Sequence, residues 1–121
     1  MKKILIVDDE PEVRGLIKDK LSQNKYAIIT AANGEEALII ARNSPPDLIL
    51  LDIAMPGMDG YAVCEKLKSE PITKNIPILF LTGKDLDPDA IVERCKDLGA
   101  NGYISKLSKL KELLEDISKV I

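Results

Sequence analysis

The chain has 121 residues, of which 45% are hydrophobic and 31% are charged, with a net charge of −3 and no histidine. This length suits one globular domain with one hydrophobic core, so we expect residues 1–121 to form a single domain. The negative charge and the small set of aromatic residues, three tyrosines and one phenylalanine, argue against direct nucleic-acid binding, which needs a basic surface and stacking platforms.

The apolar segments also bear on location. Charges interrupt them far short of the ~18 residues that cross a bilayer, so we expect no membrane span. The N-terminal MKKILIVDDE has only four apolar residues before three acids, which is too short for a signal peptide. We therefore expect a cytoplasmic protein. Cys64 and Cys95 lie singly in helix-like segments, a spacing that favours small core residues over a metal site or a disulfide.

Short apolar runs alternate with segments of helical periodicity. The runs predict strands at 4–7, 27–30, 48–51, 78–81 and 102–105. Three runs are continuous, as is typical of parallel strands covered on both faces. Apolar residues at helical spacing predict three core-facing stripes: Val13, Leu16, Ile17 and Leu21; Ile91, Val92, Cys95 and Leu98; and Leu110, Leu113, Leu114 and Ile117.

Turn-forming residues separate these elements. Pro11 suits the first turn of a helix, and Asn33-Gly34 precedes two glutamates that suit a helix start. Pro45-Pro46 should end that helix, and Gly99 should follow the end of a later one. The β-α alternation predicts an α/β fold of three layers, with an open, doubly wound, five-stranded parallel sheet between helices on both faces.

Ligands of such sheets bind at the carboxyl ends of the strands, which makes the residues there informative. Polar groups follow four of the five runs: Asp8-Asp9-Glu10, Asp52, Thr82 and Lys106. Each has an ordinary alternative. Asp8 or Asp9 could cap a helix, Asp52 could be a turn residue, Thr82 a strand-end hydroxyl and Lys106 a solvated lysine. Their convergence on one edge from four strands favours a functional site.

The chemistry of this edge suggests a metal and a phosphoryl group. Neighbouring carboxylates repel one another, and a cation between them keeps them charged. Mg²⁺ prefers carboxylate oxygens and phosphate oxygens, while a lysine and a threonine can bind the remaining phosphoryl oxygens. Without a nearby cysteine or any histidine, the plausible nucleophile is a carboxylate, which would form an aspartyl phosphate.

These residues resemble the receiver domain of two-component response regulators. The resemblance spans essentially the whole chain and is carried by Asp8-Asp9, Asp52 with the following segment 55–60 (MPGMDG), Thr82 and Lys106. It implies the flavodoxin-like strand order 2-1-3-4-5. It also implies a phosphoacceptor regulatory domain that assists its own phosphorylation and dephosphorylation, rather than an enzyme with a separate substrate.

The resemblance assigns a role to each site residue. Asp52 would accept the phosphoryl group from a phosphohistidine of a sensor histidine kinase or histidine phosphotransfer protein. Mg²⁺ would be held by Asp9, Asp52 and the backbone carbonyl of Ala54, with Asp8 helping through water. Lys106 and Thr82 would hold the phosphoryl oxygens. Movement of Thr82 would let Tyr103 swing inward and remodel the face made by the fourth helix, fifth strand and fifth helix.

Some positions depart from the family pattern. Leu107 stands where a proline commonly follows the lysine in a cis peptide, so we expect a trans bond here. Lys84 and Ala54 occupy positions that tune phosphate lifetime in the family. Segment 100–103 (ANGY) lacks the acidic pair frequent in receivers attached to winged-helix DNA-binding domains, so dimerisation of that kind is not supported.

Three other interpretations of these residues can be compared with the receiver domain. A flavodoxin-like nucleotide or flavin binder would not place Asp8-Asp9-Glu10 where a phosphate binds. An aspartyl-phosphate hydrolase would need a second acid where Ala54 stands. The alternative that stays open is a degenerate receiver serving as a non-phosphorylated interaction scaffold. The chain would act through a downstream effector protein, or through an output domain if it is part of a longer regulator or hybrid kinase.

Overall fold

A computed structural model describes residues 1–83 and 86–121, so Lys84 lies outside the described residues. Strands and helices alternate along the chain. The strands are β1 (Lys2–Val7), β2 (Tyr26–Ala31), β3 (Leu48–Asp52), β4 (Ile78–Thr82) and β5 (Gly102–Ser105). The helices are α1 (Pro11–Ser22), α2 (Gly34–Asn43), α3 (Gly60–Ser69), α4 (Pro88–Leu98) and α5 (Leu110–Ser118).

The five strands form one parallel sheet in the order β2-β1-β3-β4-β5, which confirms the predicted fold. Its register pairs Val7 with Leu51, Asp52 with Leu81 and Thr82 with Ser105. The first strand begins at Lys2, two residues before its apolar run, because Lys2 and Lys3 continue the pairing with β2. Parallel pairing places all carboxyl ends at one edge.

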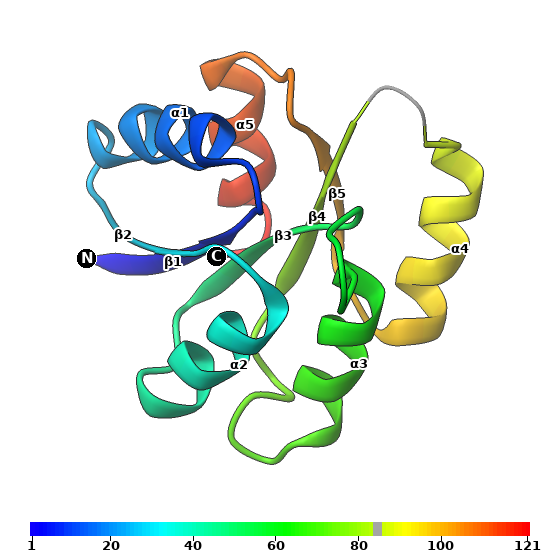
Figure 1. Cartoon of the computed structure of the whole chain (residues 1–121). Helices are drawn as coiled ribbons and strands as arrows, with labels where there is room; N and C mark the ends of the chain where they lie inside the picture. Colours follow the sequence, from blue (N-terminus) through cyan, green and yellow to red (C-terminus); the bar gives the residue numbers. More distant parts are fainter. Residues whose placement is uncertain (84–85) are drawn as a thin grey trace.

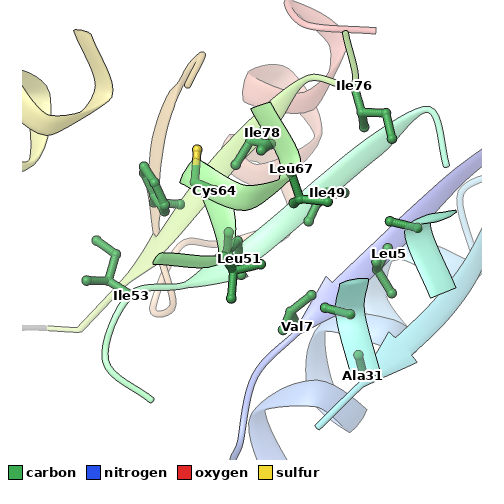
Figure 2. Close-up of a cluster of buried hydrophobic side chains, with 14 of the residues drawn as sticks. Leu5, Val7, Ala31, Ile49, Leu51, Ile53, Cys64, Leu67, Ile76 and Ile78 are labelled. Atoms are coloured by element: carbon green, nitrogen blue, oxygen red, sulfur yellow. The ribbon is translucent and has the colours of Figure 1, made fainter. Parts of the chain in front are cut away.

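Helices cover both faces of the sheet, with α1 and α5 on one side and α2, α3 and α4 on the other (Figure 1). Alternate strand residues point to opposite faces, so the core has two parts. On the α1 and α5 side Ile6, Leu50 and Leu81 pack with Ile17 and Leu21. The other part is larger, and Figure 2 shows it around Leu5, Val7, Ala31, Ile49, Leu51, Ile53, Cys64, Leu67, Ile76 and Ile78.

Helix boundaries follow the predicted signals. Pro11 begins α1, and the side chain of Asn33 caps α2 by accepting a hydrogen bond from Glu36 N at 2.8 Å. Gly99 ends α4 with a φ of 79°, a left-handed conformation that glycine adopts without strain. Cys64 and Cys95 are both buried free thiols, as expected.

Two residues of the predicted core stripes are exposed instead. Leu16 is 54% and Val92 is 40% accessible to solvent, so helical periodicity overestimated the width of the buried faces of α1 and α4. Each lies beside a buried residue of its helix, Ile17 and Ile91, at the margin of the contact with the sheet. None of the helices in residues 1–83 and 86–121 has the length and apolar character needed to span a membrane.

Candidate functional site

The residues that end β1, β3, β4 and β5 meet at the carboxyl edge of the sheet. Asp52 is the last residue of β3 and Thr82 the last of β4, while Asp8 follows β1 directly. Lys106 comes directly after β5, and its backbone N–H donates to the carbonyl of Thr82 at 2.9 Å. The topology therefore gathers the predicted polar groups at one place.

The Lys106 ammonium binds three acids at this edge. Its Nζ lies 3.0 Å from Asp8 Oδ2, 3.1 Å from Asp52 Oδ1 and 3.5 Å from Glu10 Oε1. Asp8 and Asp52 are buried, whereas the Glu10 side chain is 62% exposed. A single positive charge thus faces two buried carboxylates and one exposed carboxylate, which leaves net negative charge at the site.

The loop after β1 holds Asp8 in place from two sides. Its Oδ1 accepts a hydrogen bond from the backbone N–H of Glu10 at 2.9 Å, and its carbonyl accepts one from Arg14 Nη1 at 2.7 Å. Asp8 does not cap α1, because Glu10 is the N-cap residue, and the Glu10 side chain makes no capping hydrogen bond either. The helix-cap alternative for these acids is therefore wrong, and the carboxylates remain available to the site.

Burial and charge change the acidity of the central groups. The pKa of Asp52 is raised from its ordinary 3.8 to about 7, mainly by burial and also by the negative charge of Asp8, while Lys106 opposes both effects. Burial lowers the pKa of Lys106, but its ion pairs with Asp8 and Asp52 outweigh that effect and leave the pKa raised. Lys106 is therefore charged at neutral pH, while the ionised form of Asp52 needs additional positive charge nearby.

A divalent cation suits the oxygen atoms of this edge. Carboxylate oxygens of Asp8, Asp9 and Glu10 lie within 4.8 Å of one another. The Oδ2 atoms of Asp8 and Asp52 are buried without a hydrogen-bond partner in the described part of the chain, although Lys106 Nζ is close to the first. Unpaired buried carboxylate oxygens are costly, and Mg²⁺ or a similar hard cation would satisfy them. The residues present therefore fit such an ion.

Asp52 rests directly against the start of α3. A Cβ on Gly60 would lie 2.2 Å from the backbone oxygen of Asp52, a distance that excludes any side chain at this position. The backbone N–H of Gly60 donates to the carbonyl of Ile53 at 2.8 Å, and the Asp59 side chain caps the helix. Glycine is needed here because of this close approach, which fixes the backbone that carries the Asp52 carboxylate.

Thr82 and Tyr103 lie on the other face of the sheet from Asp52. Residue Tyr103 pairs with Phe80, and Thr82 follows Phe80 by two residues, so both share the face covered by α4. Thr82 is buried and Tyr103 is 37% exposed. Within residues 1–83 and 86–121, the Thr82 hydroxyl makes no hydrogen bond to Asp52 or Lys106, so the fold brings Thr82 to the edge without joining it to the charged cluster.

Other predicted positions lie around the same edge. Ala54 is exposed two residues after Asp52, and the bond between Lys106 and Leu107 is trans, like every peptide bond of the described chain. The sequence pattern predicted no role for Arg14, included Gly60 only as part of segment 55–60, and placed Glu10 in the acidic run without a specific contact. Arg14 contacts the backbone carbonyl of Asp8 from six residues away, a separation that matches no helical spacing.

Comparisons with known proteins agree with this geometry. Residues 4–118 match the family model described as the response regulator receiver domain. The chain is 42% identical over 120 residues to the probable transcriptional regulator ycf27 of Porphyra purpurea, covering 99% of this chain and 47% of that protein. It is 38% identical over 120 residues to the alkaline phosphatase synthesis transcriptional regulatory protein PhoP of Bacillus subtilis, covering 99% of this chain and 48% of that protein.

Solved structures show the same likeness. The chemotaxis protein CheY4 of Vibrio cholerae matches with a TM-score of 0.92 at 31% identity, over 100% of this chain and 99% of that one. The chain spans just under half of the length of the ycf27 and PhoP relatives. Because the family model covers nearly all of the chain and the strand-end residues gather as described, the chain belongs to the response regulator receiver domains of two-component signalling.

Proposed function

We propose that residues 1–121 form one receiver domain in which Asp52 accepts a phosphoryl group. The observation that carries this proposal is the contact of Lys106 Nζ with both Asp52 Oδ1 and Asp8 Oδ2, at 3.1 Å and 3.0 Å. A buried carboxylate with one oxygen on a lysine and the other unpaired is placed to act as a nucleophile in its ionised form.

The chain contributes position and charge to the transfer. One Asp52 oxygen attacks the phosphorus atom of the donor, a new P–O bond forms, and the bond to the donor's leaving nitrogen or oxygen breaks. Lys106 is placed to bind a phosphoryl oxygen once it leaves Asp52 Oδ1, and Thr82 could supply a hydroxyl donor. Mg²⁺, held by Asp8, Asp9, Asp52 and the Ala54 carbonyl, would supply the positive charge that stabilises the transferring group.

The raised pKa of Asp52 explains why a cation should be required. With a pKa of about 7, a large fraction of Asp52 is protonated at neutral pH in the absence of metal. A protonated carboxylic acid is a poor nucleophile, and a cation beside it favours the ionised form. Phosphorylation should therefore depend on Mg²⁺ both for binding the donor and for activating Asp52.

The output would pass through the face formed by α4, β5 and α5. Thr82 and Tyr103 share the side of the sheet that α4 covers, and Tyr103 is exposed there. Movement of Thr82 toward a phosphoryl group on Asp52 would leave room for the Tyr103 ring to turn inward. A histidine kinase or histidine phosphotransfer protein would phosphorylate the domain. A downstream effector protein or an attached output domain would then bind the altered face.

The experiment is incubation with acetyl phosphate and Mg²⁺, followed by intact-protein mass spectrometry. The expected result is a gain of one phosphoryl group that is absent in EDTA and absent in Asp52→Asn. A gain that survives in Asp52→Asn would contradict the assignment. No gain at all in the folded wild-type chain would favour the alternative, a degenerate receiver that serves as a non-phosphorylated interaction scaffold.

A further inference from the structure

Glu10 occupies an unusual position between the charged site and the start of α1. As the N-cap residue it stands where Ser, Thr, Asp or Asn usually caps a helix with its side chain. The Glu10 side chain makes no such bond, and its backbone alone serves the helix by accepting from Arg14 N at 3.1 Å. Its carboxylate is therefore free to act elsewhere.

The Glu10 carboxylate points to the site instead. Its Oε1 accepts a hydrogen bond from Lys106 Nζ at 3.5 Å, across 96 residues of sequence. A Glu10 oxygen also lies within 4.8 Å of oxygens of Asp8 and Asp9. The same carboxylate thus faces the lysine on one side and the acidic pair on the other.

Lys106 and a divalent cation compete for this group of acids. The lysine occupies Asp8 and Glu10, which are two members of the three-acid cluster. A cation bound among Asp8, Asp9 and Glu10 would repel the ammonium and release it. Meanwhile the buried Asp52 Oδ2 has no hydrogen-bond partner in the described part of the chain, which is a second observation that favours cation binding at this edge.

We propose that Glu10 is a positioning residue shared between Lys106 and the divalent cation. It holds the Lys106 ammonium in the cation-free protein, and it turns its carboxylate toward the cation when that ion binds. Glu10 would thereby strengthen binding of the divalent cation and release Lys106 to bind the phosphoryl group. This inference rests on the proposed function and adds a residue to its machinery.

The test is Mg²⁺ titration of the whole 121-residue chain by isothermal calorimetry at fixed ionic strength. Glu10→Gln should weaken Mg²⁺ binding about three- to tenfold, as expected for one exposed charge a few ångströms from a divalent ion. The matched control is Glu12→Gln, which removes the same charge from the exposed first turn of α1. Within the described residues Glu12 makes no ion pair with Lys106, so Glu12→Gln should weaken Mg²⁺ binding less than about twofold.

A second background separates the two roles of Glu10. Lys106→Gln removes the competing ammonium and should tighten Mg²⁺ binding, and Glu10→Gln should still weaken binding in that background. Equal losses in Glu10→Gln and Glu12→Gln, or a loss that disappears beside Lys106→Gln, would overturn the inference while leaving the proposed function intact. A wild-type chain that binds no Mg²⁺ would overturn both. Circular dichroism melts without metal check that each variant folds.

Discussion

Ionised Asp52 should destabilise the metal-free protein, and its replacement by asparagine should therefore stabilise it. Burial and Asp8 raise the Asp52 pKa from 3.8 to about 7, so the folded state binds a proton more tightly than the unfolded state. The stabilising contribution of this proton is complete below pH 3.8 and is lost as pH rises through about 7. Asparagine resembles the protonated side chain at every pH.

The gain from Asp52→Asn should grow with pH. Linkage gives an increase in the free energy of unfolding of about 2 kcal/mol at pH 5 and about 4 kcal/mol at pH 8, as an upper range for a buried, ion-paired group. The assay is urea unfolding in EDTA at both values, with Asp19→Asn on the exposed side of α1 as the control. A variant no more stable than wild type at pH 8, or a gain independent of pH, would refute this reasoning.

Three further predictions concern the packing and the metal. Gly60→Ala should lower the free energy of unfolding by at least about 1–3 kcal/mol, because the added Cβ would meet the Asp52 backbone. Gly15→Ala should raise the free energy of unfolding by about 0.5–1 kcal/mol, because a Cβ at this helical position would have no atom within 4 Å. Urea midpoints that move the same way in both variants would be inconsistent with this. Asn33→Ala should lower the free energy of unfolding by about 1 kcal/mol, because it removes the side-chain cap of α2. Asn33→Asp keeps a capping oxygen and should therefore lose much less stability, as measured again by urea unfolding. Mg²⁺ at about ten times its dissociation constant should add about 1.4 kcal/mol to wild-type stability, and thermal melts of Asp9→Asn should show a smaller gain if Asp9 is a ligand.

The fold could be predicted because local and global signals agree. Continuous apolar runs such as 48–51 require cover on both faces, and the intervening helices supply it. The strand-end position of Asp52 and Thr82 followed from the same pattern, since parallel strands bring their carboxyl ends together. The start of α2 after Asn33 was predictable because the Asn33 side chain bonds to nearby backbone, a local interaction.

Features that depend on three-dimensional contact were not predictable in this way. The need for glycine at position 60 comes from the backbone of Asp52, eight residues earlier, rather than from the turn itself. Glu10 reaches Lys106 only because β1 and β5 both end at this edge. Leu16 and Ile17 both belong to the predicted apolar stripe of α1, yet Ile17 is buried and Leu16 is exposed, a difference that depends on how α1 packs in the folded protein.

The central claim is that Asp52 itself becomes the aspartyl phosphate. Borohydride reduces an acyl phosphate to an alcohol, so treatment after reaction with acetyl phosphate and Mg²⁺ would leave homoserine at the phosphorylated residue. Peptide mass spectrometry then locates it. The account predicts homoserine at position 52 alone, and homoserine at Asp8 or Asp9 with Asp52 unchanged would contradict it.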